Sequence, residues 1–268
     1  GNARSTVGTI SDMYSLLRLL YSRIGMPHVG PASFFSFNNP NGMCPTCSGI
    51  GKIMDLDITQ MIEPDKSFDE GCFLLPAFRK DNYYWKVYRH PEYFRTDVPW
   101  KDLNKAEQNF LLYGNPIKGG PRVEKKVEGV YNQFKRLVLM KGPDEQTDST
   151  MKKISRFTFE CQCPDCMGKR LNPAALSSRI NGHSIYDMCQ MEFSDLRKEL
   201  DQIDDPRAVS VVSQLKASLD RMIDIGLPYL FMNRESATLS GGEAQRLKLV
   251  RYMGSSLCGM IYIFDEPS

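Results

Sequence analysis

The sequence lacks any apolar run of the eighteen or so residues that a membrane-spanning helix needs. Its opening stretch, GNARSTVGTI, also lacks the apolar core of a secretory signal peptide. The formal net charge is only +2 at pH 7, so bulk charge does not indicate a nucleic-acid partner and any basic surface must be local. We therefore expect a cytoplasmic protein with no membrane partner.

No GxxxxGKS/T sequence occurs, so the chain shows no P-loop of the kind that cradles nucleotide phosphates. The 268 residues are enough to bury a sizeable core, and chains of this length hold roughly two or three subdomains. Eight cysteines in a chain expected in a reducing compartment argue against disulfides. Because four of them form two CxxC pairs, they favour a metal site.

The two CxxC pairs predict a zinc site. Cys44 and Cys47 lie in NGMCPTCSGIG, and Cys163 and Cys166 lie in CPDCMGKR. Each pair has a proline after its first cysteine and a glycine shortly after its second. This pattern is typical of zinc knuckles, in which a tight turn lets backbone N–H groups approach thiolate sulfurs. Four such thiolates predict one tetrahedral Zn²⁺; Cys161 is a competing ligand but lacks the CPxC turn.

Residues 48 to 162 separate the cysteine pairs, so we expect a whole domain to be inserted inside the zinc module. A metal site tolerates this because the entropic cost of loop closure grows only logarithmically with length. Cations and aromatic rings interleave in residues 78–95, which suits contact with phosphates and exposed bases. Alternatively, the rings form the core of a small domain and the cations its solvated face. The candidate DNA contacts are Arg79, Lys80, Lys86, Arg89, Lys169 and Arg170.

The stretch LSGGEAQR, residues 239–246, predicts a phosphate-facing turn. Its serine and glycines can present a hydroxyl and bare backbone N–H groups at the start of a helix, where the helix dipole favours a phosphate. The next residues have the pattern of an amphipathic helix whose outward face carries Glu243, Arg246, Lys248 and Arg251. The predicted nucleotide-binding residues are Ser240, Gly241, Gly242 and Glu243.

A short apolar run, Met260 to Phe264, ends in Asp265 and Glu266. This pattern suits a buried strand that delivers two carboxylates at its carboxyl end. In phosphoryl transfer, the first carboxylate holds Mg²⁺ through water and the second orients the attacking water. Asp265 and Glu266 are therefore the predicted catalytic residues.

Other stretches predict structural elements. Apolar residues at helical spacing predict a helix that stops at Gly25, and a similar stripe in residues 209–223 predicts another. Residues 171–191 alternate enough to predict a short strand pair around the turn Asn181-Gly182. The remaining cysteines are expected to be small buried hydrophobes: Cys72, Cys189 and Cys258.

LSGGEAQR together with IYIFDEPS resembles the signature motif and Walker B strand of ABC-type ATPases, and the extended pair is similar to the UvrA family. The resemblance extends over residues 4–268 and includes the stretches FSFNNPNG, CPTC, CPDC, KRL and IGLPYL. It implies a mixed α/β fold belonging to a longer ABC-type ATPase half. The implied parts are a piece of the ATP-binding core at 1–25, a helical signature domain with a Cys₄ zinc module at 26–52 and 161–255, an inserted α+β domain at 53–160 and the Walker B strand at 256–268.

UvrA proteins are dimeric ATPases that bind distorted duplex DNA in nucleotide excision repair. The resemblance implies damaged double-stranded DNA as a partner, Zn²⁺ as a cofactor, and ATP, Mg²⁺ and a homodimer in the full-length parent. The signature residues would contact the γ-phosphate that the opposite ATPase half binds. Since the chain has no P-loop, we expect it not to hydrolyse ATP alone.

One departure from the family concerns UvrB. Repair-type members carry a UvrB-binding domain between the LLYSRIG helix and the FSFN segment, whereas here only Met26 to Ser33 bridge them. UvrB binding is therefore not expected from this chain. Two alternatives follow: a UvrA-like resistance protein that acts on DNA-bound drugs without UvrB, or a zinc-stabilised interaction module with no direct DNA role.

Overall fold

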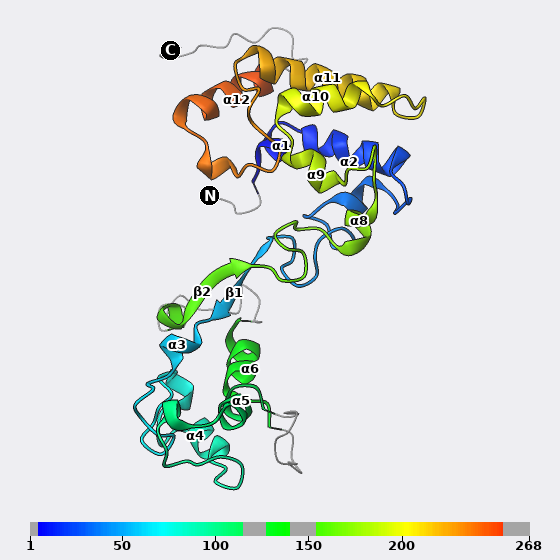
Figure 1. The fold of residues 1–268 in the computed structure, drawn as a ribbon. Helices are drawn as coiled ribbons and strands as arrows, with labels where there is room; N and C mark the ends of the chain where they lie inside the picture. The colour runs from blue at the N-terminus through cyan, green and yellow to red at the C-terminus, as the bar shows by residue number, and fades with distance from the viewer. Residues whose placement is uncertain (1–4, 115–126, 140–153, 254–268) are drawn as a thin grey trace. The chain divides into compact units, whose positions relative to one another are not determined.

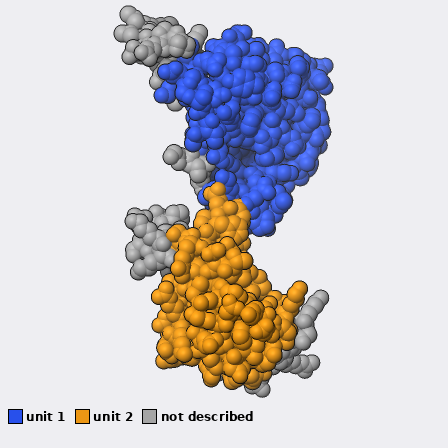
Figure 2. All heavy atoms as spheres, turned by 60° about the vertical axis from the view of Figure 1, so that its left-hand side comes forward, with its two compact units in different colours: residues 1–52, 162–268 blue, residues 53–161 orange. Residues whose placement is uncertain are grey.

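The computed structural model describes residues 5–114, 127–139 and 154–253 (Figure 1). The chain divides into two compact units (Figure 2): residues 1–52 with 162–268, and residues 53–161. The first unit is thus discontinuous in sequence, with the second inserted into it. Among the described residues, no helix is both long and apolar enough to cross a membrane.

The first unit is helical. Its core is formed where α11 packs against α2 and α10, and the side chains of Leu17, Leu196 and Leu215 are fully buried there. Its helices and 3-10 turns are α1 (Val7–Ile10), α2 (Met13–Ile24), η1 (Ala32–Phe35), α8 (Pro173–Ser177), α9 (Ile185–Gln190), α10 (Phe193–Asp201), α11 (Val209–Asp224), η7 (Ser236–Thr238) and α12 (Gly241–Met253).

Both helices predicted from apolar stripes are confirmed. α2 ends at Gly25, whose N–H donates to the Tyr21 carbonyl oxygen at 3.0 Å. α11 buries Val212, Leu215 and other apolar residues on one face, as its spacing predicts. A period of about 3.6 residues places such side chains on a single stripe.

The strand pair predicted for residues 171–191 is confirmed only at its turn, where Ile180 and His183 form one antiparallel bridge with backbone hydrogen bonds of 3.0 and 2.9 Å. Asn181 and Gly182 both have positive φ, 48° and 81°. Helices α8 and α9 flank the turn in place of strands. The Asn172 side chain accepts a hydrogen bond at the start of α8, and Ser184 and Asp187 form a capping box on α9. Each cap satisfies backbone N–H groups that a helix start leaves unpaired, which favours helix here.

The second unit combines short helices with one two-stranded sheet, β1 paired with β2. Its core is rich in phenylalanine; Phe68, Phe73 and Phe110 are almost fully buried. Its elements are β1 (Lys52–Leu56), α3 (Ile58–Met61), η2 (Pro76–Phe78), α4 (Tyr83–Tyr88), η3 (Trp100–Asp102), α5 (Lys105–Tyr113), α6 (Val130–Phe134), the π-helical η4 (Lys135–Leu139), η6 (Ser155–Phe157) and β2 (Thr158–Gln162).

Candidate functional site

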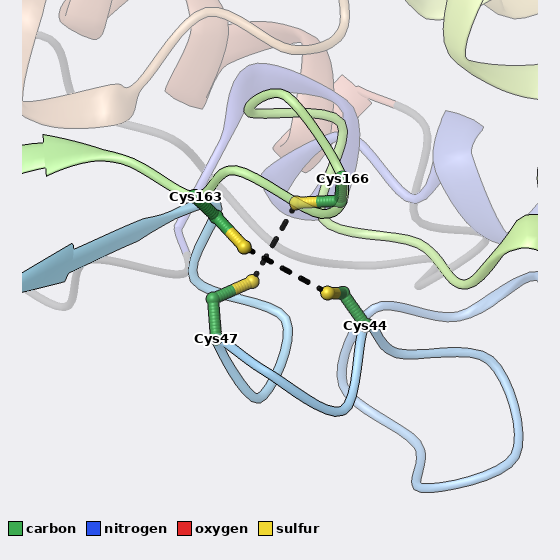
Figure 3. Close-up of side chains that lie close together, drawn as sticks. All are labelled: Cys44, Cys47, Cys163 and Cys166. Atoms are coloured by element: carbon green, nitrogen blue, oxygen red, sulfur yellow. Dashed lines mark hydrogen bonds between the residues drawn. The ribbon is translucent and has the colours of Figure 1, made fainter. Parts of the chain in front are cut away.

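The four predicted zinc ligands meet at one point of the first unit. Figure 3 shows the thiols of Cys44, Cys47, Cys163 and Cys166 converging, and their sulfurs all lie within 4.8 Å of one another. Two of the Sγ–Sγ distances are 3.9 and 3.7 Å. Tetrahedral bonds of about 2.3 Å to zinc place sulfurs about 3.8 Å apart. The buried thiols therefore have the number, type and spacing that Zn²⁺ requires.

The two knuckles, residues 44–51 and 163–170, are copies of one turn. Gly49 illustrates why the turn needs glycine, because a Cβ there would clash with the Phe37 carbonyl oxygen. Matching positions share a left-handed backbone, with φ of 49° and 48° at Ser48 and Met167, 79° and 78° at Gly49 and Gly168, and 85° and 68° at Gly51 and Arg170.

Each knuckle is also hydrogen-bonded to the other. The Cys44 N–H donates to the Arg170 carbonyl oxygen at 2.8 Å, and the Cys163 N–H donates to the Gly51 carbonyl oxygen at 2.9 Å. These matching bonds hold the two turns face to face, so the ligand geometry is fixed by the backbone as well as by the metal that the site would hold.

Backbone N–H groups approach the sulfurs, as the glycines predict. Gly51 donates to Cys47 Sγ at 3.2 Å, and Arg170 N–H bonds to the Cys166 thiol in the same way. Burial nevertheless raises the pKa of Cys166 to about 12 and also raises the pKa of Cys47. Burial opposes ionisation of Cys163 too, but backbone N–H groups together with the Cys166 and Cys44 thiols outweigh it and lower the pKa of that thiol. Metal binding must displace protons here, so affinity should rise with pH.

A polar pair between the knuckles was not anticipated. Thr46 Oγ1 donates a hydrogen bond to the Asp165 carboxylate, and both residues are exposed. They occupy matching positions of the two knuckles. The near-repeat of CPTCSG as CPDCMG is the sequence signal that could have revealed this symmetry.

The other cysteines lie outside the cluster. Cys161 is half-buried and is not one of the four grouped thiols. Cys72 and Cys189 are buried, as predicted, and burial raises the pKa of Cys72 to about 12. Cys258 lies outside the described residues.

Ser240, Gly241 and Gly242 lie at the start of α12. A Cβ added to either glycine would meet no atom within 4 Å, so the backbone at this turn is open. All three residues are exposed. The helix therefore begins with the exposed residues Gly241 and Gly242, whose backbone N–H groups have the arrangement that favours an anion.

Glu243 is buried, and the prediction that it faces solvent is wrong. Its carboxylate accepts the Ser240 N–H at 2.8 Å, and its own N–H donates to Ser240 Oγ at 3.3 Å, forming a capping box. The carboxylate also contacts Tyr229 Oη at 3.1 Å and Arg234 Nη2 at 3.2 Å. The Ser240 bond, with these contacts, lowers the pKa of Glu243. Its carboxylate is thus occupied in holding the helix start.

The rest of the predicted outward face is mixed. Lys248 is exposed, but Arg246 Nη1 lies 3.2 Å from the Ile225 carbonyl oxygen and 3.3 Å from that of Gly226. Arg246 therefore caps the end of α11. The side chain of Arg251 and the predicted catalytic pair Asp265 and Glu266 lie outside the described residues.

Most rings of the aromatic and basic stretch form core, as the alternative interpretation holds. Tyr88 and Phe94 are 3% exposed. Trp85 stacks on Phe68 with ring centroids 5.8 Å apart and donates its indole N–H to the Phe68 carbonyl oxygen at 2.9 Å. Tyr83 differs, because it is 74% exposed on α4.

The six cations predicted to contact DNA fall into two groups. Arg89 makes two hydrogen bonds to the Asp69 carboxylate, of 2.7 and 3.0 Å, and the side chain of Arg170 is only 12% exposed and ion-paired with Glu235. These placements count against both as phosphate ligands. The others are exposed and form no ion pair with another residue in the described ranges: Arg79, Lys80, Lys86 and Lys169.

Comparison with known proteins connects these features. A family model described as the UvrA DNA-binding domain matches residues 57–152, within the second unit. The UvrABC system protein A of Methanothermobacter thermautotrophicus is 35% identical over 254 residues, covering 87% of this chain and 26% of that protein. The protein of the same name from Streptomyces coelicolor is 32% identical, covering 92% of this chain and 26% of its own length.

The fold is also similar to a solved structure. The crystal structure of UvrA2 from Deinococcus radiodurans matches with a TM-score of 0.71 and 24% sequence identity, over 96% of this chain and 36% of that one. The mixed helix and strand arrangement is therefore that of a UvrA structure. The chain spans about a quarter of the length of the curated relatives it matches.

Proposed function

Because the chain belongs to the UvrA family, we propose that it supplies the zinc module and the DNA-contacting domain of an ATP-dependent protein that recognises damaged duplex DNA in nucleotide excision repair. The observation that carries this proposal is the family model for a DNA-binding domain, which matches residues 57–152. The second unit, which contains that match, also carries exposed cations without ionic partners among the described residues.

We place the DNA contact at the α4 patch, defined as Arg79, Lys80, Tyr83 and Lys86. Its three cations are exposed and can bind phosphates. Tyr83, in the same stretch of sequence, is 74% exposed and offers a flat ring on which an unpaired base can stack. A duplex distorted by damage exposes such bases, whereas an intact duplex keeps them stacked. The patch thus combines general affinity for DNA with a preference for distortion.

Equilibrium binding to a fluorescent duplex that contains an unpaired bubble tests this assignment. The triple variant R79Q/K80Q/K86Q should bind about tenfold more weakly or worse. With fewer cations the protein neutralises fewer phosphates, so binding releases fewer counterions from the DNA. The matched control K66Q/K101Q/K105Q removes the same charge from exposed lysines of the same unit and should bind nearly as wild type. Equal losses in the two variants, or no loss in the first, would contradict the patch.

The metal in this proposal is one Zn²⁺ held by Cys44, Cys47, Cys163 and Cys166. Bound zinc supplies four metal–sulfur bonds that join the knuckles, and the residues present fit it in number, burial and spacing. Because β1 begins just after the first knuckle and β2 ends just before the second, these bonds would tie together the two ends of the second unit. Its role here is structural.

The nucleotide role concerns the full-length homodimer. We propose that the Ser240 hydroxyl and the N–H groups of Gly241 and Gly242 are offered to the γ-phosphate bound by the opposite ATPase half. Asp265 would support Mg²⁺ and Glu266 would orient water, as the Walker B resemblance implies. The purified chain should not hydrolyse ATP by itself, and measurable turnover would contradict this.

The same resemblance gives the proposed domain assignment. Residues 1–25 would belong to the ATP-binding core, 26–52 and 161–255 to the signature domain, 53–160 to the insertion and 256–268 to the Walker B strand. In that arrangement, conformational changes that accompany ATP binding and hydrolysis would reach the zinc module and the insertion through the signature domain.

A second candidate function is a UvrA-like resistance protein that acts on DNA-bound drugs without UvrB. It is favoured by the short connection at residues 26–33. Met26 and Arg179 form two backbone hydrogen bonds, of 3.0 and 2.7 Å, and η1 begins at Ala32, so little chain remains to form a docking surface. Tight capture of UvrB by this chain would exclude the second candidate. Absence of salt-dependent DNA binding would instead favour a zinc-stabilised interaction module.

A further inference from the structure

We propose that the Arg170–Glu235 ion pair is a positioning contact through which bound zinc sets the conformation of the glycine turn at the start of α12. This inference rests on the zinc and nucleotide roles proposed above and adds a connection between them. Both residues belong to the first unit.

The backbone of Arg170 is tied to the metal ligands on both sides. The preceding residue, Lys169, donates its N–H to the Cys166 carbonyl oxygen at 2.9 Å, and the Arg170 carbonyl oxygen accepts the Cys44 N–H at 2.8 Å. Its φ of 68° is unfavourable for a bulky residue. The matching residue of the first knuckle is Gly51, which adopts this conformation freely. The turn itself does not require arginine, so the reason for arginine lies in its side chain.

The Arg170 side chain points from the knuckle to Glu235. Its guanidinium group is 5.4 Å from the Phe37 ring centroid, and Nη2 lies 3.5 Å from Glu235 Oε1. Nη1 is buried with no hydrogen-bond partner among the described residues. Lys52 Nζ lies 4.0 Å from the same carboxylate oxygen. A largely buried cation requires a compensating charge, and Glu235, whose side chain is 40% exposed, supplies one to Arg170.

The residue before Glu235 contacts the start of α12. Arg234 Nη2 lies 3.1 Å from the Thr238 carbonyl oxygen and 3.2 Å from Glu243 Oε2. Glu243 in turn forms the capping box with Ser240. Two consecutive residues thus contact the metal knuckle on one side and the glycine turn on the other.

Hydrogen exchange tests this connection in the chain itself. The reporters are the Ser240, Glu243 and Ala244 amides, which are bonded in the capping box and the first turn. Withdrawal of Zn²⁺ from the wild-type chain should speed their exchange by about threefold or more. Glu235→Gln should produce this increase with zinc bound and should abolish the further effect of zinc withdrawal. Arg207→Gln, which breaks an exposed ion pair with Asp205, is the control and should keep the wild-type response.

Two results would overturn the inference: exchange in zinc-loaded Glu235→Gln equal to that of wild type, or an effect of zinc withdrawal as large in the variant as in wild type. Zinc content measured on the same samples separates this failure from failure of the proposed metal site. A chain that binds no zinc refutes the site, whereas a zinc-bound chain without the coupled response refutes only the connection.

Discussion

At the scale of single residues, the glycines of the motifs differ in what they do. Gly49 has φ of 79°, and a Cβ there would meet the Phe37 carbonyl oxygen, whereas Gly242 faces open space in the first turn of α12. Gly49→Ala should therefore lower the free energy of unfolding by about 2–4 kcal/mol, because strain and a backbone clash combine. Urea unfolding of the zinc-loaded chain measures this.

Gly242→Ala is the matched control for that variant. Alanine has a higher helix propensity, so this change should be neutral or should stabilise the first unit by up to about 1 kcal/mol. Similar losses in the two variants would show that the knuckle backbone is not constrained as described.

Glu107 makes the stability of the second unit depend on pH. Two bonds from the Arg95 guanidinium, of 2.9 and 2.7 Å, lower the pKa of Glu107 to about 2, with help from the Asn104 N–H. A carboxylate whose pKa falls on folding stabilises the fold above its unfolded pKa of about 4.3. This contribution should be lost as the pH falls from about 4.5 towards 2.

Unfolding midpoints at pH 7 and pH 3 measure this effect. Glu107→Gln should destabilise the chain at pH 7 and reduce the loss between the two pH values. Asp65→Asn, whose carboxylate is 77% exposed, should leave the loss unchanged. An unaltered pH dependence in Glu107→Gln would contradict the assignment.

At the scale of elements, α4 carries both a ring that packs into the core and a ring that is exposed, and the sequence alone could not tell which was which. Trp85 is stacked on Phe68 and hydrogen-bonded to it, so Trp85→Ala should cost about 3 kcal/mol. Tyr83 lies on the exposed face, and Tyr83→Ala should change stability by less than about 0.5 kcal/mol. Chemical denaturation measures both changes in stability. If both variants fold, bubble-DNA binding should fall for Tyr83→Ala and not for Trp85→Ala. A large stability loss in Tyr83→Ala would contradict the α4 patch.

Elements were predictable where one local pattern dominated. α11 follows from a long apolar stripe, and α2 from a stripe that stops at Gly25. The alternation in residues 171–191 was misleading because caps at Asn172 and Ser184 favour helices there. The burial of Glu243 was also missed: S-x-x-E is a capping-box pattern as well as part of the ATPase motif, and Arg234, which reaches it, comes from outside the motif.

At the scale of the whole molecule, the metal centre was the most predictable long-range feature. Cysteine type and CPxC spacing specify a zinc turn locally, and two such turns complete one tetrahedral set. The contact between Arg170 of the second knuckle and Glu235 was not predictable, because the two residues meet only in the folded first unit. The core and surface rings of residues 78–95 likewise separate only once the second unit packs.

Replacement of one ligand tests the metal centre. The chain should carry about one Zn²⁺, and Cys163→Ser should lose it and speed proteolysis near residues 48–52, because three thiolates hold the metal less tightly than four. Cys161→Ser removes a half-buried thiol outside the cluster and should retain zinc. Elemental analysis measures the zinc content of both variants. Zinc retained by Cys163→Ser but lost from Cys161→Ser would contradict the ligand set.

We propose that this chain contacts DNA through the α4 patch of its second unit. The most direct test of this contact is the affinity for bubble-containing duplex DNA as salt rises from about 50 to about 200 mM. Three phosphate contacts predict that log K falls against log salt with a slope of about −2 to −3, and that R79Q/K80Q/K86Q flattens this slope. Affinity that is independent of salt, or a slope that the variant leaves unchanged, would contradict the account.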